Sequence, residues 1–83
     1  MEVNSTIRNF IMSEFKSNIQ TEDISNDYSL IDSGVIDSVG IISLLNFLEK
    51  SFSVIISSDE LMPENFDTIN LITSFVEKKI NSK

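Results

Sequence analysis

The chain has 83 residues, which suffices for one domain with one core, and we expect a single domain over residues 1–83. Its net charge of −7 disfavours nucleic acid and anionic membranes as partners, and it either keeps a small domain soluble or attracts basic partner enzymes. The lack of cysteine and histidine excludes disulfides, zinc-thiolate sites, His-bound metals, cysteine nucleophiles and Ser-His-Asp triads.

The apolar segments of the chain are short. Residues 1–10 lack the basic flank and unbroken apolar run of a signal peptide. No apolar run approaches the roughly 20 residues that cross a bilayer. We therefore expect a cytoplasmic monomer without membrane insertion.

Apolar residues at helical spacing predict a first helix of about five turns near the N-terminus. These residues are Val3, Ile7, Phe10, Ile11, Phe15 and Ile19.

From Gln20 to Asp37 the helical periodicity lapses, and we expect a long ordered loop. Isolated apolar side chains anchor this loop to the core. They are Ile24, Tyr28, Leu30 and Val35. The loop also carries Asp23, Asp27, Asp32 and Asp37. These do not match an EF-hand, which ends in a bidentate Glu, so we expect solvated acids and no metal.

A second helix is predicted over residues 38–52, where Ile41, Leu44, Leu45, Leu48 and Phe52 form an apolar stripe. Asp37 has a side chain suited to N-capping this helix, and Gly34 can take the positive φ of a tight turn before it. Ser53, after the helix, loses roughly 1 kcal/mol relative to glycine if it is left-handed.

Val54 and Ile56 alternate with Ser53, Ile55 and Ser57, as in a short strand, but no second strand is evident, so we expect an extended connector. Ser57 and Glu60 have the spacing of a capping box, which predicts a short third helix ended by Pro63.

A fourth helix is predicted with Asp67 as its cap and with Phe66 and Leu71 as a hydrophobic staple. Its buried stripe is Ile69, Ile72, Val76 and Ile80. The fold class is thus all-α, a four-helix bundle with three longer helices, one short helix and a long loop between helices one and two. The expected shared core is Ile7, Phe10, Ile11, Leu45, Leu48, Phe52, Ile56, Ile72 and Val76.

Ser38 stands at the start of the second helix in a distinctive context. Around it runs Gly34-Val35-Ile36-Asp37-Ser38-Val39, followed by Leu44-Leu45, Leu48-Glu49, Phe52, Val54, Ile56, Glu60-Leu61, Pro63-Glu64-Asn65-Phe66 and Thr68-Ile69. This pattern resembles the acyl and peptidyl carrier protein family around its modified serine. The resemblance covers the chain, more weakly, from the first helix to the fourth.

The resemblance implies that a phosphopantetheinyl transferase attaches 4′-phosphopantetheine from coenzyme A to Ser38. By the same resemblance, Asp37 helps to engage the transferase and its magnesium, in addition to capping the helix. A phosphodiester at a helix N-terminus would meet unpaired backbone N–H groups and the positive end of the helix dipole. The arm supplies the thiol that the chain lacks, so the protein presents substrates but is not an enzyme.

The outer face of the second helix is the predicted partner surface. At 100° per residue, Val39, Ile42, Ser43 and Asn46 lie on or beside the face turned away from the core stripe. The resemblance implies as partners the transferase, an adenylate-forming ligase or acyltransferase, and condensing or tailoring enzymes. Isolated surface hydrophobic residues are also common without any partner.

The second helix bears few acids, with Glu49 as its one carboxylate after Asp37 and Lys50 beside it. This weakens a role in fatty acid synthesis and favours a free-standing carrier of a polyketide, nonribosomal peptide or related acyl or aminoacyl pathway. A fatty acid carrier and a D-alanyl carrier stay open as alternatives. A rival from another class is a small acidic helical interaction module without a prosthetic group.

Overall fold

The computed structural model describes residues 3–19 and 24–82. The regular elements in these residues are all helices, with no strand among them. The longer helices are α1 (Val3–Glu14), α2 (Gly40–Phe52) and α4 (Ile69–Asn81), and α3 (Pro63–Phe66) is a single turn. Two 3₁₀ segments, η1 (Lys16–Asn18) and η2 (Ser58–Glu60), complete the elements. This confirms the predicted bundle with three longer helices and a short one. The part of the predicted loop at residues 20–23, with Asp23, lies outside the described residues.

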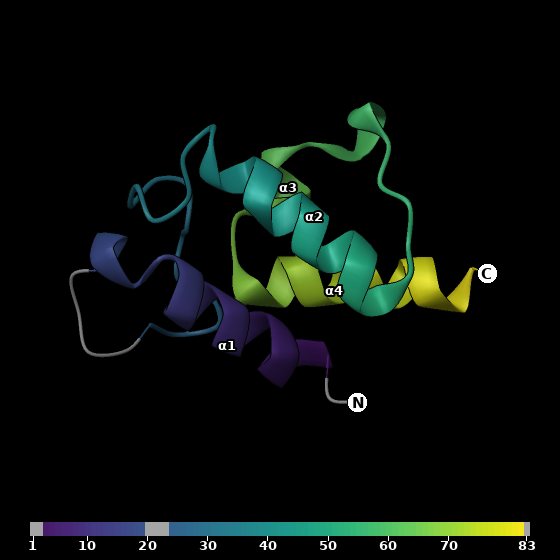
Figure 1. The fold of residues 1–83 in the computed structure, drawn as a ribbon, viewed down its shortest axis with the longest axis horizontal. Helices are drawn as coiled ribbons and strands as arrows, with labels where there is room; N and C mark the ends of the chain where they lie inside the picture. Colours follow the sequence, from purple (N-terminus) through teal and green to yellow (C-terminus); the bar gives the residue numbers. More distant parts are fainter. Residues whose placement is uncertain (1–2, 20–23, 83) are drawn as a thin grey trace.

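α4 is the central helix, because it contacts each of the other three. In Figure 1, α2 passes across α4 and begins at the side of the molecule away from the C-terminus. The described loop residues 24–39 lead to this start of α2. Ser38 lies two residues before the helix begins.

The core is apolar and largely as predicted. Ile7, Ile11, Leu48, Phe52, Ile72 and Val76 are buried, while Phe10, Leu45 and Ile56 are partly buried and pack against them. Ile24, Leu30 and Val35 are buried in the loop and Tyr28 is partly buried, which confirms that apolar side chains anchor it. Ile80 is an exception. It lies in the last turn of α4 and is 36% exposed, and Phe75 is buried in the middle of that helix.

The first helix is shorter than its apolar stripe predicted. α1 ends at Glu14, and after Phe15 the chain continues as η1 and becomes extended at Ile19. The Asn18 side-chain amide donates to the Val35 carbonyl at 3.2 Å, so the end of this turn is tied to the loop. Ile19 keeps its predicted packing against the core without being helical.

Two boundaries after α2 differ from prediction. The capping box of Ser57 and Glu60 is present, but it opens η2, and Pro63 begins α3 where we expected it to end a helix. Proline suits the first turn of a helix because its φ is fixed and it has no N–H to satisfy there. Thr68 caps α4 by accepting from Leu71 N–H at 3.0 Å, so Asp67 is not the cap and the predicted staple spacing does not apply.

Candidate functional site

The start of α2 is fixed by Asp37. One carboxylate oxygen, Oδ1, accepts from Val39 N–H at 3.1 Å and from Gly40 N–H at 2.7 Å. The Asp37 carbonyl accepts from Ile41 N–H at 2.9 Å. Although regular helix begins at Gly40, the first turn thus starts at Asp37, which confirms the predicted cap.

This cap corrects one expectation about the site. We expected a phosphate on Ser38 to meet unpaired backbone N–H groups, but those of Val39, Gly40 and Ile41 already have acceptors. The Asp37 carboxylate also offsets part of the positive potential of the helix dipole. The site therefore fits an anion that extends from the helix into solvent better than one bound against its first turn.

Ser38 is exposed between this cap and a buried segment. Val35 and Ile36, just before Asp37, are buried, and Ile36 N–H donates to the Leu30 carbonyl at 3.0 Å. Gly34 has a φ of 81°, which confirms the predicted positive-φ turn. An exposed hydroxyl on a fixed backbone has room for a covalently attached phosphodiester, so the residues present fit a prosthetic group here.

Gly40 is a residue of this site that the sequence reasoning missed. A Cβ at this position would lie 2.8 Å from Phe15 Cε1, closer than side chains pack, and 3.2 Å from Asp37 Oδ1, which is a tight contact. Glycine therefore lets the buried Phe15 ring and the capping carboxylate approach the same turn. The sequence contained a signal for this close approach, because Gly40 lies four residues before Leu44 and eight before Leu48. At helical spacing this puts Gly40 on the same buried face of α2.

The predicted partner surface is exposed to differing degrees. Val39 and Ile42 are 72% and 59% exposed, Asn46 is exposed and Ser43 is half-buried. One turn after Ser38, Ile41 lines an apolar hollow of about 230 Å³. The other lining residues are Ile31, Leu61, Met62, Pro63 and Phe66. The loop, the start of α2 and α3 thus meet close to the serine.

Comparison with known proteins decides what this site belongs to. The sequence profile of the family described as "Phosphopantetheine attachment site" matches residues 5–76 of the chain. The chain belongs to this family of carrier proteins. It carries covalently attached 4′-phosphopantetheine and is not itself an enzyme. This excludes a helical interaction module without a prosthetic group.

Curated relatives of this carrier are D-alanyl carrier proteins. The chain is 37% identical over 78 residues to that of Streptococcus suis (strain 05ZYH33), which covers 92% of each chain. Against that of Streptococcus uberis (strain ATCC BAA-854 / 0140J) it is 35% identical over 63 residues, covering 74% of this chain and 80% of the relative.

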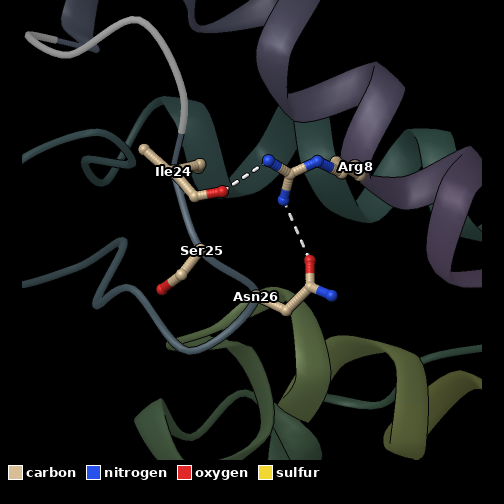
Figure 2. A pocket seen from close by; sticks show the side chains of 4 residues that line it. All are labelled: Arg8, Ile24, Ser25 and Asn26. Atoms are coloured by element: carbon tan, nitrogen blue, oxygen red, sulfur yellow. Dashed lines mark hydrogen bonds between the residues drawn. The ribbon is translucent and has the colours of Figure 1, made fainter.

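Other polar groups of the carrier have structural partners. Figure 2 shows the Arg8 guanidinium of α1 donating to the Ile24 carbonyl and, at 2.9 Å, to Asn26 Oδ1, beside an open hollow. Glu49, the one acid of α2, accepts from Ile56 N–H at 2.9 Å. Within residues 3–19 and 24–82, no cluster of acidic side chains could hold a metal ion, and no helix is long and apolar enough to span a membrane.

Proposed function

We propose that Ser38 receives the 4′-phosphopantetheine and that the resulting arm carries an aminoacyl group, with D-alanine as the first candidate. Support for the attachment residue comes from its exposure directly after the Asp37 cap. Support for the cargo comes from the relatives named D-alanyl carrier proteins, which match up to 92% of the chain. We further propose that one carrier domain fills residues 1–83 and works in the cytoplasm.

Attachment requires the Ser38 hydroxyl to act as the nucleophile of a phosphoryl transfer. Its Oγ forms a bond to the pantetheine-bearing phosphorus of coenzyme A while the pyrophosphate linkage breaks. Adenosine 3′,5′-bisphosphate leaves, and the serine proton passes to a base of the transferase. When attached, the arm supplies the terminal thiol that holds the cargo as a thioester.

Asp37 is proposed to serve both the helix and the transferase. Its Oδ1 accepts both backbone N–H groups of the cap. Within the described part of the chain its Oδ2 accepts no hydrogen bond, and we propose that it engages the magnesium ion of the transferase. Carboxylate oxygens are ligands that magnesium prefers, and its usual sites combine one or two carboxylates with substrate phosphates.

A polyketide or nonribosomal peptide pathway is the second candidate, and a fatty acid pathway the third. The observation that favours a specialised pathway over fatty acid synthesis is the uncharged outer face of α2 at Ser43 and Asn46. Each pathway predicts a different loading enzyme, so the enzyme that loads the carrier distinguishes between them.

The observation that carries the cargo assignment is the likeness to the D-alanyl carrier of Streptococcus suis over 78 residues. The test incubates the phosphopantetheine-bearing protein with ATP, magnesium, and an adenylate-forming D-alanine ligase of such a pathway. We expect an intact-mass gain of one alanyl group with D-alanine and none with L-alanine, glycine or the Ser38→Ala protein. Efficient loading by a malonyl transferase, with none by the ligase, would contradict the D-alanine assignment and leave the carrier role in place.

The proposed partner surface is Val39, Ile42, Ser43 and Asn46, because an enzyme that reaches the arm must pass close to this face. Val39→Asp and Ile42→Asp should keep the helical circular dichroism, since exposed substitutions fall within about ±0.5 kcal/mol. The rate of Ser38 modification should fall in both. Ile55→Asp is the matched control, because Ile55 is 83% exposed but lies beyond the far end of α2. Equal rates in all three variants would place recognition elsewhere.

A further inference from the structure

Asp67 makes contacts that its position in the sequence does not explain. It follows α3 directly, and its backbone N–H donates to the Pro63 carbonyl at 2.8 Å. Its carboxylate does not cap α4, because Thr68 does so. Instead, Asp67 Oδ1 accepts from the Ser29 hydroxyl at 2.7 Å and from Ile31 N–H at 3.1 Å.

The backbone of Asp67 holds the same stretch of loop. Its carbonyl accepts from Leu30 N–H at 2.6 Å, so Asp67 binds three consecutive loop residues. Ser29 Oγ in turn accepts from Asp32 N–H at 3.1 Å. Two of these donors share the side-chain oxygen Oδ1, so the side chain contributes a large share of this anchor.

The anchored stretch leads directly to the attachment residue. Leu30 is fully buried, and its carbonyl accepts from Ile36 N–H at 3.0 Å. Ile36 is itself buried and precedes Asp37 and Ser38. The described loop residues 24–37 contain no regular element, so contacts of this kind fix the backbone that presents Ser38.

We infer that Asp67 is a positioning residue for Ser38, holding residues 29–31 so that the turn before α2 presents the serine hydroxyl to the transferase. This inference rests on the proposed attachment at Ser38. Without the anchor, the loop samples other conformations, and the apparent rate of modification falls by the fraction of time that the serine is correctly placed.

The test compares three substitutions by the kcat/KM of phosphopantetheine transfer from coenzyme A, followed by intact mass. Asp67→Ala removes the carboxylate acceptor, and we expect kcat/KM to fall about tenfold. This corresponds to a loop that presents Ser38 correctly about a tenth of the time. Asp67→Asn keeps a side-chain oxygen that accepts from Ser29 and Ile31, and should stay within about twofold of wild type. Thr68→Ala, the matched control, removes the neighbouring helix cap and leaves the loop contacts in place. It should lower the melting temperature without slowing the transfer.

Amide hydrogen exchange gives a readout that a general loss of stability would not produce. In Asp67→Ala, exchange should accelerate at Leu30, Ile31 and Ile36 more than at the buried Leu48 of α2. In Thr68→Ala those loop amides should stay protected. If Asp67→Ala does not fold, Ser29→Ala can be tested instead, because it removes one donor to the carboxylate. It should slow the transfer about threefold, because Ser38 is then correctly placed for a smaller fraction of the time.

The outcomes separate this inference from the proposed function. A wild-type protein that is never modified, or a Ser38→Ala protein modified equally, defeats the attachment proposal itself. If the wild-type protein is modified at Ser38, and the Asp67→Ala or Ser29→Ala protein is modified at the same rate, only the inference is overturned. Equal losses in Asp67→Ala and Asp67→Asn would also overturn it, because they would assign the effect to the charge and not to the hydrogen bonds.

Discussion

The two ends of α2 are held by the same chemistry and serve different purposes. At the attachment end, residues 34–42, the Asp37 carboxylate accepts from backbone N–H groups of the first turn. At the connector end, residues 49–60, the Glu49 carboxylate accepts from Ile56 N–H and Glu60 accepts from Ser57 N–H at 3.0 Å. Acidic side chains thus fix the backbone at both ends.

The ends differ in what they leave exposed and in how they connect to the rest of the fold. The attachment end presents the Ser38 hydroxyl and the apolar Val39 beside it. The connector end is joined to α4, where Lys79 Nζ lies 2.7 Å from Glu60 Oε1 and 5.7 Å from the centre of the Phe75 ring. The comparison shows that a carboxylate pattern alone does not mark function. Exposed serines also occur at the connector end, at Ser57 and Ser58, so the proposed attachment at Ser38 depends on the motif around it as well as on its exposure.

The largest expected effect comes from Leu48, which is fully buried between the two ends. Leu48→Ala should lower the free energy of unfolding by about 2–5 kcal/mol through lost transfer energy and a cavity. Urea denaturation measures this change, with the exposed Ile55→Ala as control, expected within about ±0.5 kcal/mol. A loss below about 1 kcal/mol at Leu48 would mean that the two ends do not share one core.

The next effect distinguishes the two roles proposed for Asp37. Asp37→Ala removes the cap and should cost about 1 kcal/mol in the free energy of unfolding. Asp37→Asn keeps an acceptor and should unfold within a few tenths of a kcal/mol of wild type. Because the amide lacks the charge that magnesium prefers, both variants should be modified slowly by the transferase. Normal modification of a stable Asp37→Asn protein would reduce Asp37 to a cap alone.

At the connector end the expected change has the opposite sign. Ser53 has φ 55° and ψ 45°, so it adopts the left-handed conformation in which serine is less stable than glycine. Ser53→Gly should raise the free energy of unfolding by roughly 0.5–1 kcal/mol, since glycine adopts this conformation without a Cβ penalty. Ser51→Gly inside α2 is the control and should lower it by roughly 0.5 kcal/mol. Thermal unfolding distinguishes a gain from a loss.

The smallest effect is the pH dependence of the connector end. The hydrogen bond from Lys79, aided by the Ser57 backbone N–H, lowers the pKa of Glu60 below its ordinary value of 4.5. A lowered folded-state pKa contributes stability that is present above the unfolded pKa and lost as the pH falls through the folded one. In low salt, wild type should therefore exceed Glu60→Gln in stability near neutral pH. The difference should shrink below pH 4.5. A constant difference would contradict the ionic contact.

The sequence predicted those features that depend on local chemistry. The apolar spacing around Leu48 defined the buried face of α2, and Ser57 and Glu60 formed the predicted capping box. Gly34 took the predicted positive φ. Each of these follows from residue types a few positions apart, which are legible without knowing the fold.

The features that the sequence did not predict depend on contacts between distant residues. Asp67 and Thr68 are both good caps, and the choice between them follows from Ser29 and Ile31, which bind the Asp67 carboxylate across the fold. Gly40 is required by a ring at Phe15, in the turn that follows α1. Pro63 is compatible with either edge of a helix, so local chemistry alone does not decide its place.

The central claim is that the exposed serine at the attachment end carries the prosthetic group. The most direct measurement is the intact mass of the protein, and of Ser38→Ala, after incubation with coenzyme A, magnesium and a broad-specificity phosphopantetheinyl transferase. We expect a gain of one phosphopantetheine in the wild type, located at Ser38 by fragmentation, and no gain in the variant. A folded wild-type protein that gains nothing with several active transferases, or a Ser38→Ala protein that gains the same mass, would contradict it.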